Sequence, residues 1–132
     1  MTLLDTNVCV RFLRGEQSVV RRVLDADESD ELRVPAMVEG ELFYGAEKSE
    51  RRDENREKVK SLLAILPVCH TDDETMEKFG ELKARAEAVG KRVDDADVLI
   101  AATALRHSAV LVTGNTRHFS RFDGLMIEDW HK

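Results

Sequence analysis

The chain has 132 residues, of which 42% are hydrophobic and 35% charged, and its formal net charge at pH 7 is −6. This length predicts one domain, spanning residues 1–132, with room for a hydrophobic core. No apolar run reaches the roughly 18 residues that a membrane span needs, which excludes a membrane-spanning protein. The negative charge argues against a protein that coats nucleic acid non-specifically, although a local basic stripe can still guide such a substrate to an acidic site.

The opening residues and the cysteines indicate a cellular compartment. A strand is predicted at the start of the chain, so we expect no signal peptide and a cytoplasmic location. Cys9 and Cys69 lie far apart in sequence and form no CxxC pair. We therefore expect two reduced, structural thiols.

The first acidic residue follows two leucines at the start of the chain. This order predicts a short buried strand that ends at Asp5, with a helix over residues 8–13 whose N-cap is Asp5 or Thr6. In open α/β sheets, ligands bind beyond the carboxyl ends of the strands. Asp5 is therefore either only a helix cap or a residue of a functional site. A second short helix over 19–24 and an acidic loop follow.

The next strand, at 32–34, leads into a helix over 36–48. Pro35 precedes this helix and suits its first turn. Its predicted apolar stripe, at i, i+4, i+7 and i+8, consists of Val38, Leu42, Gly45 and Ala46. Glu41 lies beside that stripe. Because a buried glutamate is costly unless it is paired, metal-bound or protonated, Glu41 is either a site residue that faces the interior or an edge residue that reaches water.

Residues 49–60 are dense in charges of both signs and predict a loop followed by the start of a solvated helix. A strand at 67–69 comes next. A long helix is predicted over 73–89, with Thr71 or Asp72 as its cap. The residues expected on the inner face of that helix are Met76, Phe79, Leu82, Lys83 and Ala86.

Another helix begins at one of two capping aspartates, Asp94 or Asp95, and runs to Leu105. It is apolar nearly all round, so we expect it to be buried. Asp97 leads its most apolar face and should point toward the centre of the molecule. An acidic residue in the first turn stabilises a helix by about 0.3–1 kcal/mol through the helix dipole. This effect explains an aspartate that is exposed to water, but it poorly explains one that points inward. The position favours a functional role for Asp97.

The last part of the chain predicts a β-branched strand at 109–113, a turn, a short helical turn at 117–119 and a final strand at 125–127. Strands thus alternate with helices along the whole chain. This pattern is typical of the α/β class, with a parallel sheet covered by helices on both faces.

Such a sheet would bring Asp5, Glu41 and Asp97 to one edge. Two ionised carboxylates about 4 Å apart repel by about 4 kcal/mol at an effective dielectric of 20, so the cluster needs a cation or a proton. The four histidines are scattered and show no zinc spacing. Oxygen ligands alone point to Mg²⁺, with Mn²⁺ as the alternative, and to phosphoryl chemistry. No glycine-rich P-loop is present, so we do not expect an NTPase.

Five motifs follow one another across essentially the whole chain. They occupy residues 3–7, 41–46, 97–102, 111–119 and 124–130. Each motif alone is weak, but all five in this order and spacing are specific. Together they resemble the PIN-domain ribonucleases, and most closely the VapC-type toxins of bacterial and archaeal toxin–antitoxin pairs.

The resemblance implies a PIN-like three-layer α/β/α sandwich with a central five-stranded parallel sheet, Mg²⁺-dependent endoribonuclease activity and a homodimer. It also implies inhibition by a VapB-like antitoxin. The protein would bind operator DNA only through this antitoxin. Asp5, Glu41 and Asp97 match the family's acidic triad. By that match Asp5 and Asp97 hold the metal, directly or through water, and Glu41 orients a metal-bound water or a second ion.

Many members of the family carry a fourth acid after the fourth strand, where this chain has Asn115 and His118. Asn115 can bond to a phosphate or a metal-bound water but adds no charge, which favours a site with one metal. Thr113 and Asn7 are expected to support the site by hydrogen bonding. Hypothetical RNA contacts, each otherwise a solvated surface charge, are Arg11, Arg14, Arg51, Arg52, Lys91 and Arg92.

Three other functions compete with the ribonuclease. A catalytically weak PIN-like binding module that dimerises and binds operator DNA with its antitoxin is disfavoured by the intact triad. A phospho-acceptor receiver domain needs an aspartate after its third strand and a lysine after a later one, where this chain has Cys69-His70 and Gly114. A phosphatase with a DxD nucleophile is disfavoured because the second residue after Asp5 is Asn7.

Overall fold

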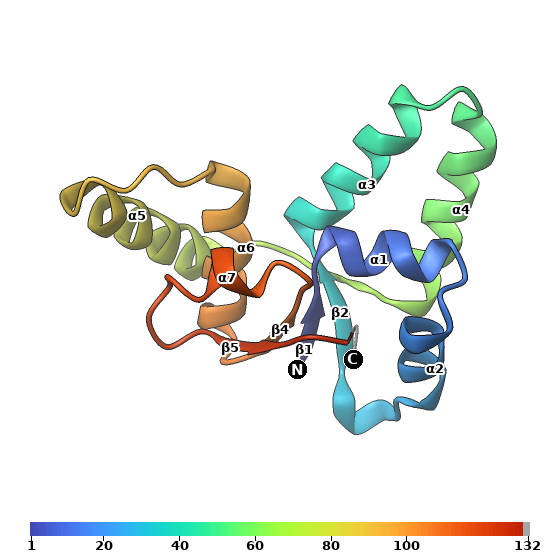
Figure 1. The fold of residues 1–132 in the computed structure, drawn as a ribbon, viewed down its shortest axis with the longest axis horizontal. Helices are drawn as coiled ribbons and strands as arrows, with labels where there is room; N and C mark the ends of the chain where they lie inside the picture. Colours follow the sequence, from blue (N-terminus) through green and yellow to red (C-terminus); the bar gives the residue numbers. More distant parts are fainter. Residues whose placement is uncertain (131–132) are drawn as a thin grey trace.

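Five parallel strands form the centre of the computed structural model, which describes residues 1–130 (Figure 1). The strands are β1 (Thr2–Leu4), β2 (Leu32–Pro35), β3 (Val68–Cys69), β4 (Val110–Val112) and β5 (Met126–Glu128). Their order across the sheet is β3-β2-β1-β4-β5, and each pair of neighbours is parallel. The predicted five-stranded parallel sheet is confirmed.

Helices connect the strands and flank the sheet. They are α1 (Thr6–Leu13), α2 (Gln17–Asp25), α3 (Ala36–Lys48), α4 (Arg52–Ile65), α5 (Asp73–Ala88), α6 (Asp95–Arg106) and the short α7 (Thr116–Phe119), with a 3-10 turn at Glu28–Asp30. In Figure 1, α3 and α4 form one pair and α5 and α6 form another, on either side of the sheet. The predicted α/β/α sandwich is confirmed.

The strand β1 lies at the centre of the sheet and sets the position of the first acid. Leu3 of β1 pairs with Arg33 of β2 and with Leu111 of β4. Because the strands run in one direction, their carboxyl ends meet at one edge of the sheet. Asp5 follows β1 at that edge and Thr113 follows β4, as the backbone bond from the amide of Asp5 to the carbonyl of Val112 shows, at 2.9 Å.

The two helices that carry the other acids pack as their sequences predict. The helix α3 has the predicted bounds, and Val38, Leu42 and Ala46 are buried, although Gly45 is exposed. On α6, Val98 and all five residues from Ile100 to Ala104 are buried. Its nearly uniform apolar sequence therefore corresponds to a helix enclosed on most sides, and its N-cap is Asp94.

The predicted inner face of α5 is partly wrong. Leu82 is buried, but Met76 is 47% exposed and Thr75 is fully buried in its place. The cap explains the difference, because an oxygen of Asp72 accepts bonds from the amide and the hydroxyl of Thr75, both at 2.8 Å. These bonds satisfy the buried threonine and lower the pKa of Asp72 to about 2.

Both cysteines are buried free thiols, as predicted. Burial, with the nearby charge of Asp5 as a second cause, raises the pKa of the Cys9 thiol to about 12. Cys9 therefore remains a neutral core residue. Over residues 1–130, none of the helices has the length and apolar character that crossing a membrane requires.

Candidate active site

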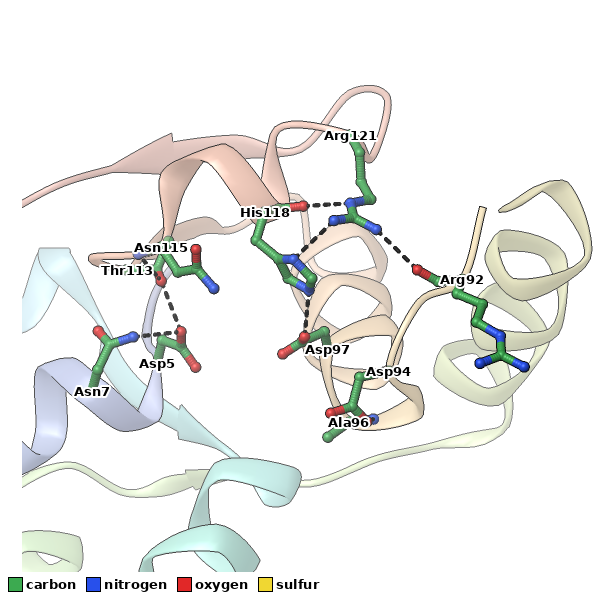
Figure 2. A network of polar contacts seen from close by, with 10 residues as sticks. All are labelled: Asp5, Asn7, Arg92, Asp94, Ala96, Asp97, Thr113, Asn115, His118 and Arg121. Carbon is green, nitrogen blue, oxygen red and sulfur yellow. Dashed lines mark hydrogen bonds and ion pairs between the residues drawn. The ribbon is translucent and has the colours of Figure 1, made fainter. Parts of the chain in front are cut away.

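Asp5 caps α1 and is held at the end of β1 by neutral donors. Its Oδ1 accepts a hydrogen bond from the amide of Thr6 at 2.8 Å, and its Oδ2 accepts from the hydroxyl of Thr113 at 2.7 Å and from Nδ2 of Asn7 at 3.3 Å (Figure 2). Only 6% of Asp5 is exposed. Burial raises the pKa of Asp5 and the charge of Asp97 adds to that effect, while the three hydrogen bonds oppose it. Asp5 can therefore both cap α1 and belong to a functional site.

The residues around Asp5 also fix the loop that follows β4. The hydroxyl of Thr113, which is fully buried, accepts a hydrogen bond from the amide of Asn115 at 3.0 Å. The side chain of Asn7 accepts one from the amide of Gly114 at 3.1 Å. Thr113 and Asn7 thus make the hydrogen bonds expected of supporting residues, and Asn115 is placed beside Thr113 (Figure 2). Whether they serve a reaction stays a prediction.

Glu41 reaches the same region from α3. Its Oε1 accepts a hydrogen bond from the hydroxyl of Thr6 at 2.7 Å. Burial raises the pKa of Glu41, and the charges of Asp5, Asp97 and Asp94 raise it further, against the lowering effect of the Thr6 bond. Glu41 is therefore a half-buried acid that faces the other carboxylates.

Asp97, in the first turn of α6, contacts His118, and His118 in turn contacts Arg121; the sequence analysis assigned neither residue to the site. Its Oδ2 lies 2.6 Å from Nε2 of His118 on α7. The other ring nitrogen of His118 lies 2.9 Å from Nη2 of Arg121 (Figure 2). In the sequence, His118 was noted only because it stands where many members of the family have a fourth acid. The spacing of three residues between His118 and Arg121 in a helical turn is the one signal that could have joined them.

The donor set at this edge fits a hard divalent cation. Asp5, Glu41 and Asp97 supply only carboxylate oxygens, and their mutual repulsion leaves a net negative site that a cation would relieve. In residues 1–130, no three His, Cys, Asp or Glu side chains form a group that could hold a metal ion. Mg²⁺ commonly keeps several waters and uses one or two carboxylates. A site of this kind would need only one or two of the three carboxylates, with water in the other ligand positions.

The six basic residues predicted to contact RNA lie on three separate parts of the molecule. Arg11 and Arg14 lie at the end of α1, Arg51 and Arg52 where α4 begins, and Lys91 and Arg92 between α5 and α6. Three of them form exposed ion pairs, at 3.3 to 3.5 Å, which are Arg11–Glu16, Arg51–Glu54 and Arg52–Glu47. Their contact with RNA remains a prediction.

A family model, that of the PIN domain, matches residues 2–125. The match covers β1 to β4 and the three acids Asp5, Glu41 and Asp97. The chain therefore belongs to the PIN-domain family.

Several relatives of similar length are VapC proteins. Ribonuclease VapC2 of Rickettsia felis is 30% identical over 131 residues, which cover 98% of each chain. The tRNA(fMet)-specific endonuclease VapC of Shigella flexneri is 30% identical over 128 residues, covering 97% of this chain and 96% of its own. The structure of DNA-bound VapBC from Salmonella typhimurium aligns with a TM-score of 0.89 at 30% identity, covering 98% of this chain and 97% of that one. The predicted VapC-type resemblance is confirmed.

Proposed function

We propose that this protein is a Mg²⁺-dependent endoribonuclease and the toxin of a VapBC-type pair. It hydrolyses RNA phosphodiester bonds, and Asp5, Glu41 and Asp97 form its active site. The observation that carries the proposal is the convergence of these acids from the end of β1, from α3 and from α6, where burial raises the pKa of Asp5 and of Glu41 and the charges of neighbouring acids raise it further. The relatives named ribonuclease and endonuclease support the same reaction.

Each residue has a role that follows from its contacts. A bound Mg²⁺, or Mn²⁺, would supply the positive charge that binds the scissile phosphate and activates water. Asp5 and Asp97 would hold it, and the bonds from Thr6, Thr113 and Asn7 keep Asp5 in one orientation. Glu41, with its raised pKa, is suited to orient the attacking water and take its proton.

Asn115 takes the role of a neutral support. It lies beside Thr113, where it can donate a hydrogen bond to a phosphate oxygen without adding negative charge. The proposed site therefore holds one ion at rest. The RNA backbone would meet the basic residues Arg11, Arg14, Arg51, Arg52, Lys91 and Arg92.

The proposed partners, an antitoxin and operator DNA, are inferred from the VapBC proteins that this chain resembles. The structure from Salmonella typhimurium is named as VapBC bound to DNA. We infer that this chain is one cytoplasmic domain, residues 1–132, which forms a homodimer. A VapB-like antitoxin inhibits it and provides its only contact with operator DNA.

The test is cleavage of total cellular RNA, and of tRNA(fMet) as the first defined substrate, by the purified, antitoxin-free protein in Mg²⁺, Mn²⁺ or EDTA. We expect metal-dependent cutting that falls about 100-fold or more in Asp5→Asn and in Asp97→Asn, because each loses several kcal/mol of transition-state stabilisation. The exposed Asp53 of α4 provides the matched control, Asp53→Asn, which should cut like the wild type. Circular dichroism checks folding.

Two results would contradict the proposal. Equal cutting by the wild type and by both site variants would indicate a contaminating nuclease and would remove Asp5 and Asp97 from the site. If the wild type cuts no RNA, yet binds Mg²⁺ and binds operator DNA together with an antitoxin, the chain is the binding module instead.

A further inference from the structure

Arg121 makes three polar contacts at the edge of the proposed site, none of which the proposed reaction uses. Its Nε donates to the backbone carbonyl of His118 at 2.9 Å, and its Nη1 donates to the backbone carbonyl of Arg92 at 3.3 Å. Its Nη2 lies 2.9 Å from Nδ1 of His118 (Figure 2). The guanidinium is thus fixed by α7 and by the segment before α6, and it holds the imidazole ring from behind.

These contacts determine which nitrogen of His118 carries hydrogen. A guanidinium is always charged and can only donate, so Nδ1 of His118 must be the acceptor of the bond from Arg121. The neutral ring then carries its hydrogen on Nε2. That hydrogen points at Oδ2 of Asp97, 2.6 Å away, which accepts it.

The arrangement has two effects on a bound ion. Oδ2 of Asp97 already accepts the hydrogen bond from His118, so Oδ1 is the more available oxygen for a metal. Nε2 of His118, the ring nitrogen nearest to Asp97, has no lone pair to offer, since it carries the hydrogen. A histidine close to the site is thereby kept out of the ligand set.

We propose that Arg121 is a positioning residue which, through His118, orients Asp97 toward the ion with one oxygen and maintains an all-oxygen site that favours Mg²⁺ and Mn²⁺ over Zn²⁺. This inference rests on the proposed function, because it concerns the same metal site. Outer partners of this kind change metal affinity by about 10- to 100-fold when they are removed. Zinc binds imidazole well, so release of Nε2 should improve its binding relative to Mn²⁺.

The first experiment needs no metal. Long-range ¹H–¹⁵N spectra of the full chain in EDTA distinguish Nε2–H from Nδ1–H histidines, and His118→Gln assigns the signal among the four histidines. We expect the Nε2–H form in the wild type and its loss in Arg121→Leu. The matched control is Arg117→Leu, which removes an exposed arginine from the same short helix and should change nothing.

The second experiment measures binding of Mn²⁺ alone, by electron paramagnetic resonance, and of Zn²⁺ alone, by calorimetry. We expect Arg121→Leu to weaken Mn²⁺ binding about 10-fold and to raise the ratio of Zn²⁺ to Mn²⁺ affinity by a similar factor. His118→Gln, whose amide can still donate to Asp97, should stay within about threefold of the wild type. In a His118→Leu background, Arg121→Leu should cause no further loss of Mn²⁺ affinity, because its effect passes through the ring.

The outcomes separate this inference from the proposed function. An Nδ1–H ring in the wild type, unchanged metal affinities in Arg121→Leu, or a further loss in the His118→Leu background would each overturn the role of Arg121 while the metal site stands. A wild type that binds no Mn²⁺ would overturn the metal site itself, and this inference with it, even if the ring shows Nε2–H. Circular dichroism excludes a general folding defect in each variant.

Discussion

The two aspartates of the proposed site have different surroundings. Asp5 is almost fully buried, and the groups that bond it are neutral: two side chains and one amide. The Asp97 side chain is 25% exposed, and an imidazole backed by a guanidinium contacts it. The protein therefore fixes Asp5 by geometry and leaves its charge uncompensated, whereas it places a permanent positive charge behind Asp97. A cation at the site should consequently matter more to Asp5 than to Asp97.

The largest expected effect concerns stabilisation by metal. At a Mg²⁺ concentration 100-fold above its Kd, binding should raise the free energy of unfolding of the wild type by about 2.7 kcal/mol. Asp5→Asn should lose nearly all of this gain, and Asp97→Asn should lose less, because Asp5 has the less compensated charge. Thermal or urea unfolding with and without Mg²⁺ measures both. A greater loss in Asp97→Asn would reverse the comparison.

The next effect concerns the donors around Asp5. Thr113→Val keeps the shape of a fully buried side chain but removes the hydroxyl that lies 2.7 Å from Asp5. A hydrogen bond to a charged group contributes about 1.5–3 kcal/mol, so the free energy of unfolding at pH 7 should fall by roughly that amount. Thr113→Ser, which keeps the hydroxyl, is the matched control. If urea denaturation gives equal values for both variants, the loss comes from packing and not from the bond to Asp5.

The smallest effect is one of pH, because the bonds from Thr113, Thr6 and Asn7 partly oppose the effect of burial on Asp5. Its folded pKa is raised above the ordinary value of 3.8, so the unfolded chain loses this proton at a lower pH than the folded protein does. The folded state then binds more protons, and the free energy of unfolding falls as pH rises from about 3.8 through the raised pKa, after which it is level.

Asp5→Asn cannot release this proton, so without metal its stability relative to the wild type should rise with pH across that window. Denaturation in EDTA at several pH values measures the difference between the two proteins. If the stability of Asp5→Asn relative to the wild type stays constant or falls as pH rises, burial does not raise the pKa of Asp5.

Much of the fold follows from short-range signals in the sequence. Pro35 and the apolar spacing after it specify α3 with its observed bounds, and Asp94 and Asp72 cap their helices where predicted. The alternation of strands and helices predicts a parallel sheet but not the order of its strands, which depends on how each crossover packs. The position of Asp5 after β1 follows from the chain itself, because the residue that ends a strand is local information.

The contacts of Asp97 could not be predicted in the same way. His118 is 21 residues from Asp97 in sequence, and the two meet only because α7 lies over the start of α6. Arg121 reaches the site by spanning to the carbonyl of Arg92, 29 residues away. Thr75 was missed for a related reason, since a satisfied polar side chain can replace an apolar one in a core and periodicity alone favours Met76.

The hydrogen bond between Thr113 and Asp5 spans 108 residues of sequence, and it has a consequence for synthesis of the protein. Among the five strands, the central β1 is made first, but its neighbour β4 is made fourth, after α5 and α6. Contacts of such long range form late, because the intervening chain must be made and ordered first. A nascent chain that ends at α5 contains neither Asp97 nor Thr113. For the proposed ribonuclease, translation itself thus delays the assembly of the active site until β4 and Thr113 have been synthesised.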